Sequence, residues 1–170
     1  MSKAVADSTV LIYLAKLDQL ELLEQTYDTV LIPEEVYREV VEQGKELGEK
    51  DAVRVEKEIS KNLIELKNIE VEENMEKFEM EAGEKEVLSL AKKQNIDEVL
   101  IDESSVREIA ETFDLKPRGT LYFLLKTVRD NKKSLGEFLE LMKDLSEAGF
   151  HLNEKVYVKA VREAQKLAEE

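Results

Sequence analysis

Short apolar runs alternate with amphipathic segments along most of this chain of 170 residues. Between the runs, apolar residues recur at the 3.6-residue spacing of a helix that buries one face. Strands separated by helices predict a mostly parallel sheet covered on both faces. We therefore expect the α/β class, as a three-layer α/β/α sandwich with a small sheet. The expected strands lie at residues 5–7, 29–32 and 98–102, with one or two more within 63–71.

The sequence predicts a single domain over residues 1–170, because no repeat, low-complexity segment or linker divides it. A chain of this length can bury a sizeable core. Amphipathic helices are expected at about 135–168. They either pack on that domain or serve in oligomerisation, and the sequence leaves both uses open.

Two of the predicted strands run directly into an acid, at Asp7 and Asp102. A carboxylate at the end of a buried strand is costly unless something pairs with it. Ligands of open parallel sheets bind beyond the carboxyl ends of the strands, so the two acids share one site if their strands are neighbours. The alternative for each is an N-cap of the helix that follows. Ser8 could add a hydroxyl ligand or cap its helix.

Glu84 and Glu39 are further candidates, on two different helices. Glu84 lies on the apolar stripe of the helix predicted at 84–94, where it either joins the site or interacts with the helix dipole as a first-turn acid. Glu86 points elsewhere. Glu39 flanks the apolar face of a helix that begins at Pro33, so periodicity alone indicates a solvated boundary position.

Three more positions are weighed beside these acids. Glu103 could join Asp102 or point away from it. Ser104 or Ser105 is expected to cap the next helix. Thr120 follows Gly119 and could either lend a hydroxyl near the site or cap a largely buried helix.

Composition removes several kinds of chemistry. The chain has no cysteine and one histidine, His151, in an expected helix–helix connection. Structural zinc sites and nucleophile–histidine catalysis are therefore not expected. A site of oxygen ligands alone selects hard cations, Mg²⁺ or Mn²⁺. Such a metal could polarise a phosphoryl oxygen and activate a water, which favours hydrolysis of phosphodiesters.

The net charge of −14 argues against binding nucleic acid through a broad basic face, but a small site could still meet a phosphate through a metal. Abundant Glu and Lys lean towards a thermophile. No apolar run approaches the roughly 20 residues that span a bilayer, and no signal peptide precedes the first strand. We expect a cytoplasmic protein with no membrane association.

Taken in order, the motifs of this chain resemble the PIN domain family, in particular its small prokaryotic branch related to toxin nucleases. None of the pieces is specific alone, but their order and distances are similar to those of the family. The pieces are residues 5–9, 32–40, 83–87, 100–103 and 119–121.

The resemblance implies a metal-dependent ribonuclease, an RNA substrate, a homodimer and an antitoxin protein as a partner. The acids that it makes catalytic are Asp7, Glu39, Glu84 and Asp102, with Glu39 supported mainly by this match. The metal ligands would be Asp7, Glu84, Asp102 and Glu103, supported by Ser8 and Thr120. Glu103 departs from the Asp often found there, and the resemblance does not settle whether Glu84 or Glu86 takes the central role. The alternatives are a binding or regulatory module of the same fold without catalysis, and a phosphatase acting on small phosphoesters.

Overall fold

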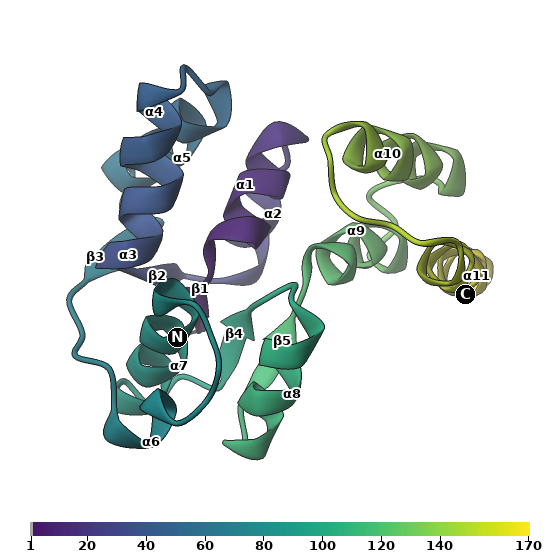
Figure 1. Cartoon of the computed structure of the whole chain (residues 1–170). Coiled ribbons are helices and arrows are strands. Elements are labelled where there is room, and N and C mark those ends of the chain that lie inside the picture. Colours follow the sequence, from purple (N-terminus) through teal and green to yellow (C-terminus); the bar gives the residue numbers. More distant parts are fainter. Residues whose placement is uncertain (1) are drawn as a thin grey trace. The chain divides into compact units, whose positions relative to one another are not determined.

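A five-stranded sheet with the strand order β3-β2-β1-β4-β5 forms the centre of the first part of the molecule (Figure 1). Every pair of neighbouring strands is parallel. The predicted α/β class is therefore confirmed, with a fully parallel sheet. The strands are β1 (Lys3–Ala6), β2 (Thr29–Pro33), β3 (Ile64–Lys67), β4 (Glu98–Leu100) and β5 (Lys116–Arg118).

This computed structural model describes residues 2–170, and the chain divides into two compact units, Met1–Arg118 and Gly119–Glu170. Each unit is described by itself. The prediction of one domain over the whole chain stays a prediction.

The central strand of the sheet is buried, whereas the edge strand β5 is partly exposed. Ala4, Val5 and Ala6 of β1 are fully buried, as expected for a strand with neighbours on both sides and helices on both faces. Pro117 lies in the edge strand β5, where the missing amide hydrogen costs no ladder bond on the open side. The chain therefore places its apolar strand segments at the centre of the sheet.

Helices cover both faces of the sheet, as predicted for a three-layer sandwich. Right-handed crossovers require the helices that follow β1 and β2 on one face and those that follow β3 and β4 on the other. The first group is α1 (Ser8–Lys16), α2 (Glu21–Thr26), α3 (Glu34–Tyr37), η1 (Arg38–Gln43), α4 (Gly44–Glu46) and α5 (Lys50–Ser60). The second is α6 (Glu73–Glu76), α7 (Ala82–Lys93) and α8 (Ser104–Thr112).

The helix after β2 is continuous from Glu34 to Glu46, and its middle section, η1, is a π-helix. The helix ends at Gly48, which has a positive φ of +73°. Gly44 stays helical. A Cβ there would stand 2.7 Å from the Cβ of Ala52, so the missing side chain lets α5 pack closely.

Three boundaries differ from the sequence prediction. β1 and β4 end at Ala6 and Leu100, so each acid follows its strand and is not part of it. Helix α7 begins at Ala82, one residue before Gly83, because Glu81 and Glu84 form a capping box around its first turn. The N-cap of α8 is Glu103, which has extended backbone, so Ser104 is already helical and neither serine caps.

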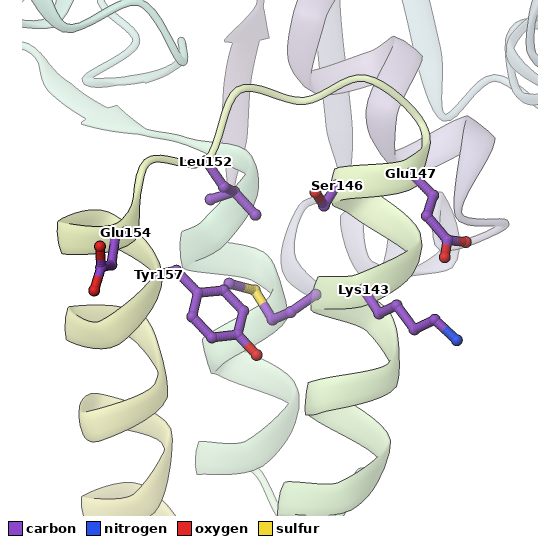
Figure 2. A pocket seen from close by; sticks show the side chains of 7 residues that line it. Lys143, Ser146, Glu147, Leu152, Glu154 and Tyr157 are labelled. Carbon is purple, nitrogen blue, oxygen red and sulfur yellow. The ribbon is translucent and has the colours of Figure 1, made fainter.

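The second unit consists of three helices, α9 (Thr120–Arg129), α10 (Leu135–Glu147) and α11 (Glu154–Glu169). Figure 2 shows Tyr157 of α11 pointing towards α10, in an open pocket that Leu152 also lines. His151 is exposed in the predicted connection between α10 and α11. Within residues 2–170 no helix is long and apolar enough to cross a membrane. The buried apolar side chains include Phe123, Leu124, Phe138, Met142, Leu145, Ala160 and Ala164.

Candidate acidic site at the carboxyl edge of the sheet

The strand order reverses between β1 and β4. From β1 the chain builds β2 and β3 on one side, and then crosses to β4 on the other side of β1. Such a switch point opens a crevice beyond the carboxyl ends of the two strands. Ala6 pairs with Leu100, and the Asp7 amide donates to the Leu100 carbonyl at 2.9 Å. The expectation that the two strands are neighbours is confirmed, and Asp7 and Asp102 both follow them at this point.

Asp7 is buried, with 5% of its surface exposed. It is the N-cap of α1, but its Oδ1 accepts from the amide of the next residue, Ser8, at 2.9 Å. An ordinary N-cap side chain binds the second or third amide of the helix. The pKa of Asp7 is raised to about 7, chiefly by burial. The Ser8 amide lowers this pKa, and the charges of nearby carboxylates raise it. Those carboxylates are Glu84, Glu39 and Asp102.

Glu39 lies in the first turn of the π-helix η1, three residues after the buried Val36 of α3. It keeps the boundary position that periodicity indicates, at the edge of the buried face. Glu39 is half-buried, and its Oε2 accepts from the Ser8 hydroxyl at 2.9 Å. Burial raises the pKa of Glu39, although the Ser8 hydroxyl lowers it. Ser8 thus ties two acids together, through its amide to Asp7 and its hydroxyl to Glu39.

Gly83 allows α7 to approach the helix that carries Glu39. A Cβ on Gly83 would lie 3.1 Å from Oε1 of Glu39 and 3.6 Å from Cγ of Glu35. Glu84, the next residue, accepts from the Glu81 amide at 2.8 Å. Burial raises the pKa of Glu84, and the charges of Glu81, Glu103 and Glu39 raise it further. A residue without a side chain therefore brings two acid-bearing helices together.

Glu84 and Glu86 lie in different surroundings. Glu86 accepts from the Glu35 amide at 3.4 Å, at the start of α3. Burial raises the pKa of Glu86, the Glu35 amide lowers it, and the charges of Glu35 and Glu34 raise it. The charge of Glu84 acts on Asp7, whereas Glu86 is not among the groups that shift Asp7. The geometry supports Glu84 as the central acid of this helix.

Asp102 is half-buried and lies two residues beyond the end of β4. Since Glu103 is the N-cap of α8, the capping alternative does not hold for Asp102. Glu103 is exposed, its side chain makes no capping bond, and its charge acts on Glu84. Thr120 is a buried residue at the start of α9, in the second unit, so its place near the acids stays a prediction.

The carboxylate oxygens of this site suit a hard cation. Carboxylates that raise one another's pKa repel, and a cation among them removes that repulsion. Within residues 2–170, no three acid or histidine side chains already stand as a metal-binding group. Glu39 and Glu84 accept hydrogen bonds from Ser8 and Glu81 instead. Each carboxylate uses one oxygen for this bond, which leaves its other oxygen open to Mg²⁺, Mn²⁺ or a water that such an ion binds.

Glu81 is the acid that sequence reasoning missed. Its charge raises the pKa of both Glu84 and Glu39. It lies just after residues 72–80, a polar and acid-rich stretch in which one more acid does not stand out. The signal that could have found it is the spacing of three residues between Glu81 and Glu84, the spacing of a capping box.

Comparison with known proteins agrees with this fold. A family model described as a PIN domain matches residues 3–166. A solved structure, described as a domain of a functionally unknown protein from Methanocaldococcus jannaschii DSM 2661, is 19% identical. The match covers 70% of this chain and 91% of that one, with a TM-score of 0.47. No relative was found among curated proteins.

Proposed function

Since the chain belongs to the PIN domain family, we propose that it is a divalent-metal-dependent ribonuclease that hydrolyses phosphodiester bonds of RNA. PIN domains are generally nucleases and usually use divalent metals. The observation that carries the proposal is the buried Asp7 carboxyl, whose pKa of about 7 reflects burial and three further acids at the switch point of the sheet. A cation bound among these carboxylates would offset that cost.

We assign the metal to Asp7, Glu84, Asp102 and Glu103, and the orientation of the attacking water to Glu39. Glu39 is tied to Asp7 through Ser8, so it is held beside the metal ligands. A bound Mg²⁺ or Mn²⁺ would polarise the phosphoryl oxygen and favour ionisation of a water. The protein's own part is to fix the acids, exclude water around Asp7 and accept a proton at Glu39.

The test is cleavage of labelled single-stranded RNA by the purified chain with Mn²⁺, with Mg²⁺ and with excess chelator. Asp7→Asn and Asp102→Asn should each abolish cleavage, because each removes a metal-binding charge. The same preparations of the variants control for contaminating nucleases. Wild-type cleavage that persists in chelator would overturn the proposal.

A second candidate is a binding or regulatory module of this fold in which the acids have no catalytic role. The bond between the Ser8 amide and Asp7 favours it, because that contact also holds the start of α1. In this case Asp7→Asn lowers thermal stability. In an empty metal site the same substitution removes repulsion among the acids, so thermal stability rises. A phosphatase of the same site would instead hydrolyse a generic phosphoester in preference to RNA.

As a toxin-type nuclease, the protein would act in the cytoplasm as a homodimer and bind an antitoxin protein. These proposals rest on the family alone. Sedimentation or light scattering of the purified chain tests the dimer, and a molar mass close to 19.6 kDa would count against it.

A further inference from the structure

The net negative charge of the chain comes from one unit alone. Residues 1–118 hold 16 Lys and Arg against 30 Asp and Glu, whereas residues 119–170 hold nine of each. The unit with the acidic site thus accounts for the whole net charge of −14. Such a surface repels a phosphate backbone. Apart from a metal bound at the acidic site, cations outside the first unit are therefore favoured to hold an RNA substrate.

One helix of the neutral unit concentrates such cations on one face. The cations of α11 are spaced i, i+4, i+7 and i+11, which aligns them along a single side of a helix. All four are exposed, on the side opposite the buried Ala160 and Ala164, and they line an open groove. They are Lys155, Lys159, Arg162 and Lys166.

Helix chemistry accounts for only part of this stripe of cations (Lys155, Lys159, Arg162 and Lys166). Lys166 lies in the last turn, where the helix dipole favours a cation, but Lys155 lies in the first turn, where the dipole disfavours one. Each member has a like charge three or four residues away, which disfavours the helix, although Glu163 has opposite-charge spacings to Lys159 and Lys166. In the described part of the chain, no ion pair within 4.0 Å involves any of the four. The stripe is therefore available to an external polyanion.

We propose that this stripe on α11 binds the phosphate backbone of the single-stranded RNA substrate. The choice of RNA rests on the proposed function. From Lys155 to Lys166 the helix rises by about 16 Å, enough for several phosphates of one strand. Two acids, Glu154 and Glu163, also line the groove, so its four cations outnumber its acids by two. Val158 is its sole apolar residue and none is aromatic, so the groove lacks both the anchors of a protein interface and a stacking platform.

The binding that follows is electrostatic and independent of sequence. Arg and Lys that neutralise phosphates release counterions, so affinity falls steeply with salt. Because both units belong to one chain, RNA held by α11 is at a high effective concentration for the acidic site. The stripe thus acts on substrate affinity and has no part in the chemical step.

The test measures binding of a labelled single-stranded RNA in EDTA, where no metal-dependent cleavage occurs, from 50 to 200 mM salt. The double variant K159Q/K166Q should weaken binding at 50 mM salt by about tenfold and flatten the plot of log affinity against log salt by roughly 1.4, or about 0.7 for each lost contact. The matched control is K50Q/K57Q, which removes two exposed lysines, also seven residues apart on one helix, α5. It should bind as the wild type does.

An unchanged salt slope in K159Q/K166Q, or an equal loss in K50Q/K57Q, overturns the assignment to α11. Thermal melting of both variants checks that they fold. With Mn²⁺, K159Q/K166Q should raise KM and leave kcat, because the stripe contributes uniform binding. If the wild type binds RNA through the stripe and cleaves none, the ribonuclease proposal fails and the stripe stands. If the wild type cleaves RNA with metal and K159Q/K166Q binds RNA as the wild type does, the stripe proposal fails and the ribonuclease proposal stands.

Discussion

Asp7 combines burial, one strong hydrogen bond and three like charges in a single carboxyl. The Ser8 amide is one donor against a larger desolvation cost, so the pKa of Asp7 still rises from 3.8 to about 7. Ser8 serves two acids at once, and Glu39 gains its place through that hydroxyl. At the scale of the residue, the site is an arrangement of acids that a cation would stabilise.

The raised pKa of Asp7 makes stability depend on pH. Between pH 4 and 7 the folded state holds a proton that the unfolded state has released, so stability falls as pH rises through this window and stays low above it. Asp7→Asn removes a cost of at most about 4 kcal/mol. At pH 8 in EDTA, a gain of half that size would raise Tm by roughly 4–8 °C.

Melting of wild type and Asp7→Asn between pH 5 and 8 checks this expectation. The difference in Tm should shrink towards pH 5. Asp144→Asn removes the same charge from an exposed position and should change stability by less than about 0.5 kcal/mol. A lower Tm for Asp7→Asn at pH 8 would show that Asp7 mainly holds the start of α1.

Glu84 and Glu86 offer a matched pair of substitutions on one helix. Glu84→Gln should lower kcat/KM for RNA cleavage by about 100-fold or more, because it removes the charge of a carboxylate that we assign to the metal. Glu86→Gln should retain most activity, since its carboxylate faces the start of α3. Rates at several Mn²⁺ concentrations separate lost metal affinity from lost turnover. A larger loss in Glu86→Gln would reverse the assignment.

The elements that position the acids are a π-helix and a glycine contact. The π-helix η1 carries Glu39, and Gly83 lets the first turn of α7 lie against it. The π-helix also buries Val40 and Val41, so it serves the core as well as the site. Gly83 has no side chain to bury, so a change there should affect activity more than stability.

Gly83→Ala and Gly136→Ala make this distinction measurable. Both glycines are the second residue of a helix, and alanine favours a helix by up to about 1 kcal/mol. At Gly136 the new Cβ would meet Ser134 Oγ at 3.8 Å, an ordinary contact. At Gly83 it would meet Glu39 Oε1 at 3.1 Å, so Glu39 must shift.

We expect Gly136→Ala to raise Tm and leave cleavage unchanged. Gly83→Ala should gain less stability and lose about tenfold or more in kcat, because a small misplacement of a catalytic group is costly. Thermal melting and single-turnover cleavage of the two variants measure both effects. Full activity in Gly83→Ala would show that Glu39 can move without loss.

For the whole molecule, charge is divided between a strongly acidic unit and a neutral one with a cationic helix. A divalent ion bound among the acids is linked to folding, because the unfolded chain does not hold the four carboxylates together. Stability should therefore report binding even where no RNA is cleaved.

Adding Mn²⁺ should raise the stability of the wild type by about 2.7 kcal/mol at 100 times its Kd. The combined variant Asp7→Asn/Asp102→Asn should show little of this gain. Melting with increasing Mn²⁺, against NaCl of equal ionic strength, separates specific binding from screening of the surface charge. An equal effect of the two salts would remove the support for a metal site.

Much of the architecture could be predicted from the chain alone. Apolar strand segments separated by amphipathic helices determine a parallel α/β sheet, because each element must bury one face. The acids after β1 and β4 are visible as abrupt ends of apolar runs. The absence of cysteine and near absence of histidine limits the site to oxygen ligands. Each of these follows from residue type and short-range order.

Tertiary structure decided the remainder. The adjacency of β1 and β4 depends on a crossover over distant residues, which no local pattern encodes. Glu39 has the boundary position that the 3.6-residue period indicates, and only the packing of its helix against Ser8 and Gly83 brings it to the acids. Periodicity places Glu84 and Glu86 on different sides of α7, and packing then places Glu86 at the start of α3 and the charge of Glu84 near Asp7. Sequence determined which residue types could form a site, and packing determined which of them meet, since burial and charge act through space.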